Sequence, residues 1–154
     1  MATEHETFFE TPASRKLVDL IEHNAEELTT GYIEIVRHDP RMPGYREFNQ
    51  KEIWTRAFRV FSQLGRWISC ETTKEEMTNY WTALGKQRRA EGFPFSEIIL
   101  SLCHIRSLLW QKVQAEGLMD TALDLYQAID LYNRVVLFFD RAMYFAAAGY
   151  EKKS

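Results

Sequence analysis

Glycine, proline and cysteine are scarce in this chain. Its 154 residues include 7 glycines, 4 prolines and 2 cysteines. So few turn-forming residues disfavour an all-β protein, which needs a turn after every short strand. The two cysteines, Cys70 and Cys103, are too few for a disulfide framework or a cysteine-rich metal cluster. We therefore expect reduced thiols and a cytoplasmic location.

Long apolar runs and long basic runs are also missing. No stretch of about 18 apolar residues occurs, which argues against a membrane-spanning helix. The acidic segment at residues 1–10 lacks the apolar region of a signal peptide. The net charge is −3 and the basic residues are dispersed, whereas nucleic-acid-binding domains concentrate them on one surface. We expect neither a membrane nor a nucleic acid as a partner.

The sequence contains none of the short motifs that carry catalysis or metal binding. It has no G-x-S-x-G, no H-E-x-x-H, no C-x-x-C and no glycine-rich phosphate loop. A haem ligand should project from the centre of an apolar helical stripe. None of the four histidines does so: His5, His23, His38 and His104. We therefore predict no catalytic residues, no metal and no cofactor.

Apolar residues at helical spacing occupy most of the chain. No segment alternates apolar and polar residues as a half-buried strand would. The pattern predicts an all-α, single-domain bundle of about five helices, at about 12–38, 48–68, 72–90, 96–117 and 119–148. We place a flexible arm at residues 1–11, a helical domain at 12–150 and a short tail at 151–154.

The predicted fourth helix, with Ser96 as its N-cap, carries the widest apolar stripe, so we expect it at the centre of the bundle. Its stripe is formed by Ile98, Leu102, Ile105, Leu109 and Val113. Arg106 lies near the middle of that stripe, where an unpaired guanidinium would be costly. Asp140 lies on an apolar stripe of the last helix. We predict a buried or half-buried Arg106–Asp140 ion pair that fixes helix register. The alternative is that Arg106 lies in a ligand cavity lined by Trp81, Trp110 and Tyr144.

The last predicted helix has two apolar stripes on opposite sides. We assign one to the core: Leu125, Ile129, Tyr132, Val136, Phe139 and Met143. One chain of this size rarely buries both sides of a helix, so the other stripe predicts a homodimer interface. That interface would contain Leu131, Val135, Phe138, Ala142 and Phe145. In the alternative interpretation, the arm at residues 1–11 covers this second stripe.

A short basic cluster, KQRRAEG, occupies residues 86–92 at the end of the predicted third helix. Cations at a helix C-terminus interact favourably with the helix dipole, and we prefer that explanation. The alternative is that the cluster meets an anionic ligand or partner.

Two segments resemble a known family. Residues 80–110, YWTALGKQRRAEGFPFSEIILSLCHIRSLLW, and residues 131–151, LYNRVVLFFDRAMYFAAAGYE, are similar to the N-terminal domain of RsbRD-type RsbT co-antagonists. The order of blocks carries the resemblance: Tyr-Trp, Leu-Gly, Gly-Phe-Pro-x-Ser-Glu, Arg-x-x-Leu-Trp, Phe-Phe-Asp-Arg-Ala-x-Tyr and Gly-Tyr-Glu. It covers about half of the chain, and residues 1–70 add a compatible helical pattern.

The resemblance implies a non-enzymatic, globin-like domain without haem that dimerises and serves as a sensory or protein-interaction input in bacterial signalling and stress response. Such domains commonly precede an output module, which would begin after Glu151. We expect either a stand-alone member or the input part of a longer protein. The family supplies no catalytic residues to transfer. The alternative function is a ligand-binding globin-like domain that holds haem or a small apolar molecule.

Overall fold

The computed structural model describes residues 6–116 and 119–152, which form eight helices. These helices are α1 Arg15–His23, α2 Ala25–His38, α3 Pro43–Glu47, α4 Gln50–Ser62, α5 Leu64–Ile68, α6 Lys74–Ala90, α7 Phe95–Glu116 and α8 Ala122–Glu151. Within the described residues, extended pairing is limited to one isolated bridge between Thr7 and Thr73. The predicted all-α class is confirmed.

The number of helices exceeds the prediction because two predicted helices are broken. Asn24 separates α1 from α2, and its side-chain amide donates to the Leu20 carbonyl at 2.7 Å. Asparagine side chains compete for backbone groups in this way and interrupt helices. Gln63 similarly separates α4 from α5. The connection between the first two predicted helices contains the short helix α3, which has Pro43 in its first turn, a position that suits proline.

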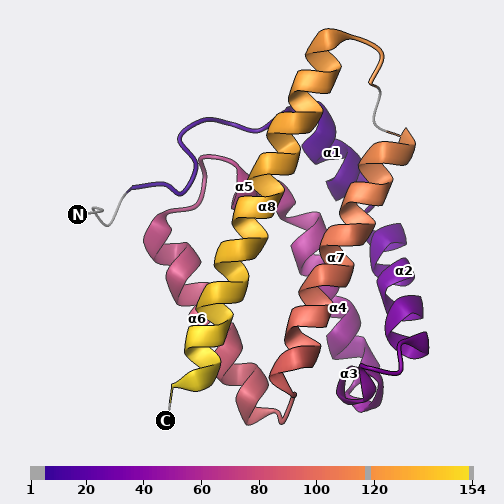
Figure 1. The fold of residues 1–154 in the computed structure, drawn as a ribbon, viewed down its shortest axis with the longest axis vertical. Coiled ribbons are helices and arrows are strands. Elements are labelled where there is room, and N and C mark those ends of the chain that lie inside the picture. Colours follow the sequence, from indigo (N-terminus) through magenta and orange to yellow (C-terminus); the bar gives the residue numbers. More distant parts are fainter. Residues whose placement is uncertain (1–5, 117–118, 153–154) are drawn as a thin grey trace.

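The turn between α6 and α7 differs from the prediction by one residue. α7 begins at Phe95, so Ser96 is not its N-cap. Pro94 precedes the helix, and its carbonyl accepts from the Glu97 amide at 3.1 Å. Gly92 adopts a φ of +87°, a left-handed conformation that glycine takes without steric cost. This turn reverses the direction of the chain between α6 and α7 (Figure 1).

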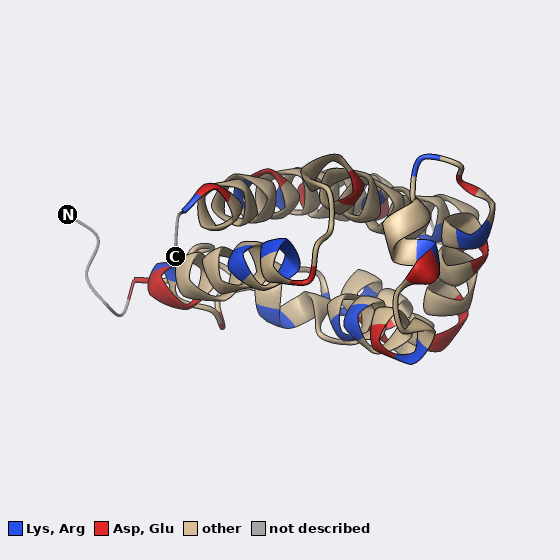
Figure 2. Cartoon of the chain, turned by 90° about the horizontal axis from the view of Figure 1, so that it is seen from below, with Lys and Arg blue, Asp and Glu red and all other residues tan. Residues whose placement is uncertain are grey.

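The helices form two layers around one core (Figure 1). α7 and α8 lie side by side in front, with α4 and α6 behind them, and the view along the long axis shows the same layers (Figure 2). All five residues of the predicted α7 stripe are buried: Ile98, Leu102, Ile105, Leu109 and Val113. Within the described residues, no helix combines the length and apolarity that crossing a bilayer requires.

The orientation of α8 is the reverse of the prediction. Four of the five residues predicted to form a dimer interface are buried within the chain: Leu131, Val135, Phe138 and Ala142. Phe145 is half-buried. Of the stripe predicted to face the core, Phe139 is buried, whereas Leu125, Ile129 and Tyr132 are each about half exposed, at 51%, 52% and 48%. The inward stripe continues through Ala146 and Gly149, small residues that let another helix approach closely.

The close approach occurs where α6 crosses α8. A Cβ atom added to Gly85 would lie 2.0 Å from the Ala146 carbonyl oxygen. A Cβ atom on Gly149 would lie 2.0 Å from the Thr82 carbonyl oxygen. The two backbones are therefore in direct contact, and neither glycine position has room for a side chain.

The part of the predicted arm that the structure describes, residues 6–11, is fixed against the helical domain. The amide of Phe8 donates to the Thr72 carbonyl at 3.2 Å, and the amide of Lys74 donates to the Glu6 carbonyl at 2.8 Å. Arg134 of α8, which is buried, donates to the Thr11 carbonyl at 2.7 Å and to the Ile68 carbonyl at 3.0 Å. Residues 1–5 of the predicted arm lie outside the described residues.

Replacing Gly85 with alanine is expected to lower the free energy of unfolding by about 3 kcal/mol or more, because the new methyl group would force two backbones apart. Chemical denaturation measures the loss. Gly31→Ala is the matched control, since its Cβ would meet only Leu108 at 3.7 Å. In the middle of α2 that substitution is expected to be neutral or stabilising by up to about 1 kcal/mol. Equal effects of the two substitutions would contradict the close crossing.

Candidate ligand cavity and outer apolar face

The predicted ion pair between Arg106 and Asp140 forms, but it is not buried. Arg106 Nη1 lies 4.0 Å from Asp140 Oδ1, and the two side chains are 35% and 60% exposed. The prediction of a buried or half-buried pair is therefore wrong for its aspartate. Arg106 projects from the edge of the α7 stripe toward solvent between α7 and α8, where water screens the charge.

The other residues predicted to line a ligand site do not come together. Trp81 on α6 is buried and lines an internal cavity. Trp110 on α7 lines a separate apolar groove beside α8. Tyr144 is exposed and packs its ring against Phe145. Arg106 lines neither hollow, so these four side chains do not share either of the two hollows found among the described residues.

The cavity that does exist, which we call the core cavity, lies between α4, α6 and α7 and has a volume of about 280 Å³. Its exposed lining residues belong to α4 and α6, so it opens between these two helices. Besides Trp81, its apolar walls are formed by Ile53, Ala57, Val60, Ile98, Leu102 and Ile105. The helical spacing of these residues along α4 and α7 is that of the stripes that form the core.

Buried polar side chains gather in one part of this cavity, and we call them the polar cluster: Tyr32, Tyr45, Arg88 and Ser101. The Tyr32 hydroxyl lies 2.6 Å from Ser101 Oγ. Burial raises the pKa of Tyr32 far above its ordinary value. Burial also raises the pKa of Tyr45, although the positive charge of Arg88 opposes that shift. Both phenols are therefore neutral hydrogen-bonding groups at physiological pH.

Arg88 is held near the cavity by an ionic network. Glu91 accepts two hydrogen bonds from Arg56, at 2.9 and 2.6 Å, and lies 3.4 Å from Arg88 Nη1. Burial would raise the pKa of Glu91, but the hydrogen bonds and charge of Arg56, with the charge of Arg88, lower it. Glu91 thus stays ionised and partly neutralises two guanidinium groups. Contact of the basic cluster at residues 86–92 with an anion stays a prediction.

Glu97 positions the α3 wall of the cavity. Its carboxylate is buried and accepts hydrogen bonds from the amides of Gly44 at 2.8 Å and Tyr45 at 3.2 Å. These amides belong to the first turn of α3, which has no intrahelical partner for them. Sequence reasoning missed this contact because the partners lie 53 and 52 residues apart.

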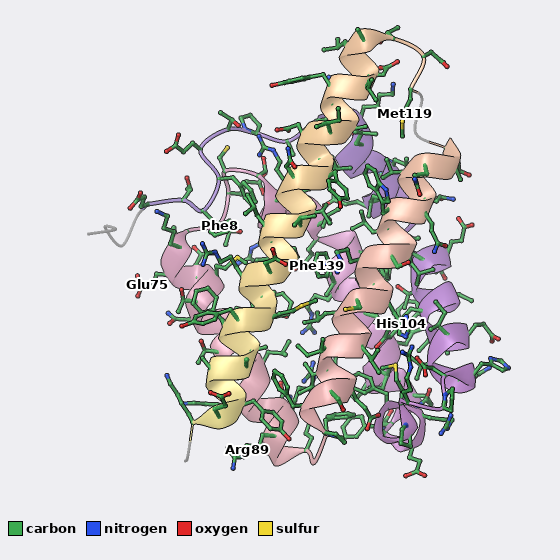
Figure 3. All side chains as sticks on the ribbon, in the orientation of Figure 1. Phe8, Glu75, Arg89, His104, Met119 and Phe139 are labelled. Atoms are coloured by element: carbon green, nitrogen blue, oxygen red, sulfur yellow. The ribbon has the colours of Figure 1, made fainter. Side chains whose placement is uncertain are left out.

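The predicted surface histidine His104 has a buried partner. Its Nε2 lies 2.9 Å from Asp39 Oδ2, and Arg41 binds the same carboxylate at 3.0 and 2.9 Å. In Figure 3 His104 lies on the side of α7 that faces α2. Hydrogen bonds from Arg41, and then from His104, hold the pKa of Asp39 well below its usual range. The pair joins the α2–α3 connection to α7.

The outward side of α8 carries large apolar residues, and we call it the α8 outer face. Its members are Leu123, Leu125, Tyr126, Ile129, Tyr132, Leu137 and Tyr144. At one end, an apolar groove of about 270 Å³ lies between Trp110 of α7, Met119 and the start of α8. Figure 3 shows Met119 on the connection between the two helices. Large exposed apolar residues that gather on one side of a helix are typical of an interaction site.

The comparisons with known proteins identify the fold. No family model matches the sequence, and no curated protein matches it. The structure is similar to the crystal structure of the ferric globin domain of DosC from E. coli, with a TM-score of 0.66. The similarity covers 86% of each chain at 14% sequence identity.

The fold is globin-like. At this identity the likeness extends to the fold alone. The resemblance to RsbRD-type domains has no match among these comparisons, yet its sequence blocks fall at structurally linked places. Leu-Gly contains Gly85 of the helix crossing, and Gly-Tyr-Glu contains Gly149. The Tyr150 hydroxyl also donates to the Phe93 carbonyl in the Gly-Phe-Pro block at 2.8 Å.

The side chains of the core cavity do not fit a haem. None of the described residues that line it is a histidine, cysteine or methionine, the usual axial ligands. A tyrosinate can bind haem iron, but burial keeps Tyr32 protonated. His23 and His38 are exposed and His104 faces Asp39, while His5 lies outside the described residues. Among those residues, no group of three His, Cys, Asp or Glu is placed to hold a metal ion.

Replacing Arg106 with methionine is expected to cost less than about 1 kcal/mol of stability, because the ion pair it removes is exposed. The same change at Arg134 is expected to cost about 2 kcal/mol or more, because it leaves two carbonyls without their charged donor. Thermal and chemical unfolding of the two variants measure the difference. If Arg106→Met were the more destabilising variant, the exposed setting of Arg106 and the buried setting of Arg134 would both be wrong.

Replacing Asp39 with asparagine is expected to destabilise the protein at neutral pH, with the deficit shrinking as the pH falls below about 4, the ordinary pKa of aspartate. The reason is linkage: a carboxyl whose pKa is lowered by folding stabilises the fold above its unfolded pKa and loses that contribution as pH drops toward its folded value. Unfolding curves of both proteins between pH 7 and pH 3 measure the gap. A gap that is constant or widens on acidification would contradict the interaction.

Proposed function

We propose that this chain is a non-enzymatic, cytoplasmic input module of bacterial signalling, a globin-like domain that works without haem and resembles the RsbRD-type co-antagonists. In this proposal it forms a homodimer and passes a change in helix packing to a signalling partner or an output domain. The observation that carries the proposal is the α8 outer face, where Leu125, Ile129 and Tyr132 are about half exposed. Leaving these side chains in water is unfavourable.

The dimer proposal still rests on the two apolar stripes of the last helix. The interface is now assigned to the stripe that was predicted to face the core, because that stripe is the more exposed one. Two copies related by a two-fold axis would bring the α8 outer face of each against that of the other, with the groove at Trp110 alongside. The exposed Arg106–Asp140 pair lies next to this surface. It would form part of a polar rim, which is the usual surrounding of an apolar contact.

The route for a packing change is built from α6 and α8. α6 forms one wall of the core cavity and touches the α8 backbone at Gly85 and Gly149. Near the end of α8, Arg89 donates to the Tyr150 carbonyl at 2.7 Å and the Tyr150 hydroxyl reaches the Phe93 carbonyl. A ligand that binds better to one placement of α6 would therefore shift α8, which satisfies the thermodynamic requirement for signalling.

A second candidate function is a ligand-binding globin-like domain, and the core cavity favours it. The two candidates are compatible, since an input module needs a signal to bind. Binding is preferred to catalysis because the sequence lacks the motifs for nucleophilic, metal and phosphate chemistry. The polar cluster also consists of one arginine, two phenols and a serine, with no histidine or carboxylate to activate the serine.

The purified protein is expected to be a dimer at micromolar concentrations by light scattering, and Ile129→Glu is expected to be a folded monomer. A carboxylate at that position would have to be desolvated in the contact. Thr55→Glu is the matched control, because it adds the same charge to an exposed position of α4 and should leave the dimer intact.

Circular dichroism establishes that both variants are folded. A wild-type protein that remains monomeric across this concentration range would remove the dimeric signalling proposal. A dimer that survives Ile129→Glu would place the interface elsewhere on the chain.

A further inference from the structure

We propose that the core cavity binds a small organic monocarboxylate with a compact apolar body, and that Arg88 recognises its carboxylate. This inference rests on the proposed sensory function, for which it supplies the class of ligand. The observation behind it is a buried cation that faces a hollow and makes only a long, one-atom contact of 3.4 Å with the nearest carboxylate, Glu91.

Arg88 is only 6% exposed and lines the cavity. Among the described residues, its hydrogen bonds to Gln87 Oε1 at 3.3 Å and to Glu91 Oε1 at 3.4 Å both use Nη1, and both are long. Glu91 makes its short, two-pronged contact with Arg56 instead, at 2.9 and 2.6 Å. A buried guanidinium gains most from a bidentate carboxylate, and within the described residues Arg88 has no such partner. A ligand carboxylate would supply it.

A second buried donor also lacks an acceptor. Trp81 is 1% exposed and lines the cavity, and its indole Nε1 makes no hydrogen bond to any described residue. An unsatisfied buried donor costs free energy that an acceptor on a bound molecule would recover. The neutral hydroxyls of Tyr45 and Ser101 add further hydrogen-bonding groups beside Arg88. The polar cluster therefore matches an anionic group with several acceptor positions.

The cavity walls outside the polar cluster determine what the part of the ligand beyond its carboxylate must be. Its walls beyond the polar cluster are aliphatic, and they suit an apolar body. The volume of about 280 Å³ is just below the range of pockets that hold drug-sized molecules, so the body must be compact. The opening between α4 and α6 is lined by Arg59, Gln87 and Glu52, and Arg59 adds a positive charge at the entrance.

The test uses a panel of small monocarboxylates, benzoate, pivalate and isobutyrate, against the intact wild-type chain. Isothermal titration calorimetry measures affinity, and tryptophan fluorescence reports on Trp81. Benzamide, the neutral counterpart of benzoate, and inorganic phosphate are the ligand controls. At least one carboxylate is expected to bind, with benzamide at least tenfold weaker and phosphate showing no binding at the same concentrations.

Arg88→Gln is expected to weaken carboxylate binding by at least tenfold, and Arg88→Lys is expected to retain part of it because it keeps the charge. Trp81→Phe should weaken binding several-fold while preserving the packing of the ring. Arg106→Gln is the matched control outside the cavity and should bind as the wild type does. If Arg88→Gln fails to fold, the Lys and Phe variants and the benzoate–benzamide comparison decide the question.

Three results would overturn the inference: no binding of any carboxylate by the folded chain at millimolar concentration, equal binding of benzamide, or phosphate binding as tight as that of the carboxylates. Equal losses in Arg88→Gln and Arg106→Gln would do the same. If the protein is a dimer but binds none of these carboxylates, the cavity inference is wrong and the dimeric signalling proposal is unaffected. If the protein is a monomer but binds benzoate through Arg88, the dimeric signalling proposal is wrong and the cavity inference is unaffected.

Discussion

The contact between the backbones of α6 and α8 is the constraint on which the rest of the structure depends. Gly85 and Gly149 remove the side chains that would keep the two helices apart. Once this distance is fixed, α8 must turn Ala146 and Gly149 toward α6, and the opposite side of the helix, with Leu125 and Ile129, faces solvent.

The cavity is a costly feature for a chain of this size. Protein interiors are close-packed, and a hollow beside a buried guanidinium forfeits both packing and solvation. The chain limits the electrostatic cost by keeping Glu91 ionised between Arg56 and Arg88 and by surrounding Arg88 with neutral hydroxyls. Sites where a sequence departs from the best local packing are where function is expected, which is consistent with a binding role for this region.

Sequence periodicity predicted the helical class and the inward stripe of α7, because both depend only on spacing along one helix. It did not predict which side of α8 is buried, since the two stripes are similarly apolar. Ala142, Ala146 and Gly149 were the available signal, because small residues in line mark a close helix crossing. The sequence correctly predicted the Arg106–Asp140 contact but not how exposed it is. A helical wheel shows the direction of a side chain and not the position of the neighbouring helices. Glu97 with Gly44, and His104 with Asp39, depend on the tertiary fold and leave no local pattern.

The four hydrogen bonds of Arg134 have a mechanical consequence for α8. Its guanidinium joins the carbonyls of Thr11 and Ile68, the Thr11 hydroxyl and Asp130 on the same helix. Rolling α8 about its own axis would withdraw the group from both carbonyls together, whereas a small tilt pivoting near Arg134 would preserve them. This arginine therefore fixes the rotational setting of α8, while the backbone contact at Gly149 and the hydrogen bonds of Tyr150 hold the far end of the helix in place.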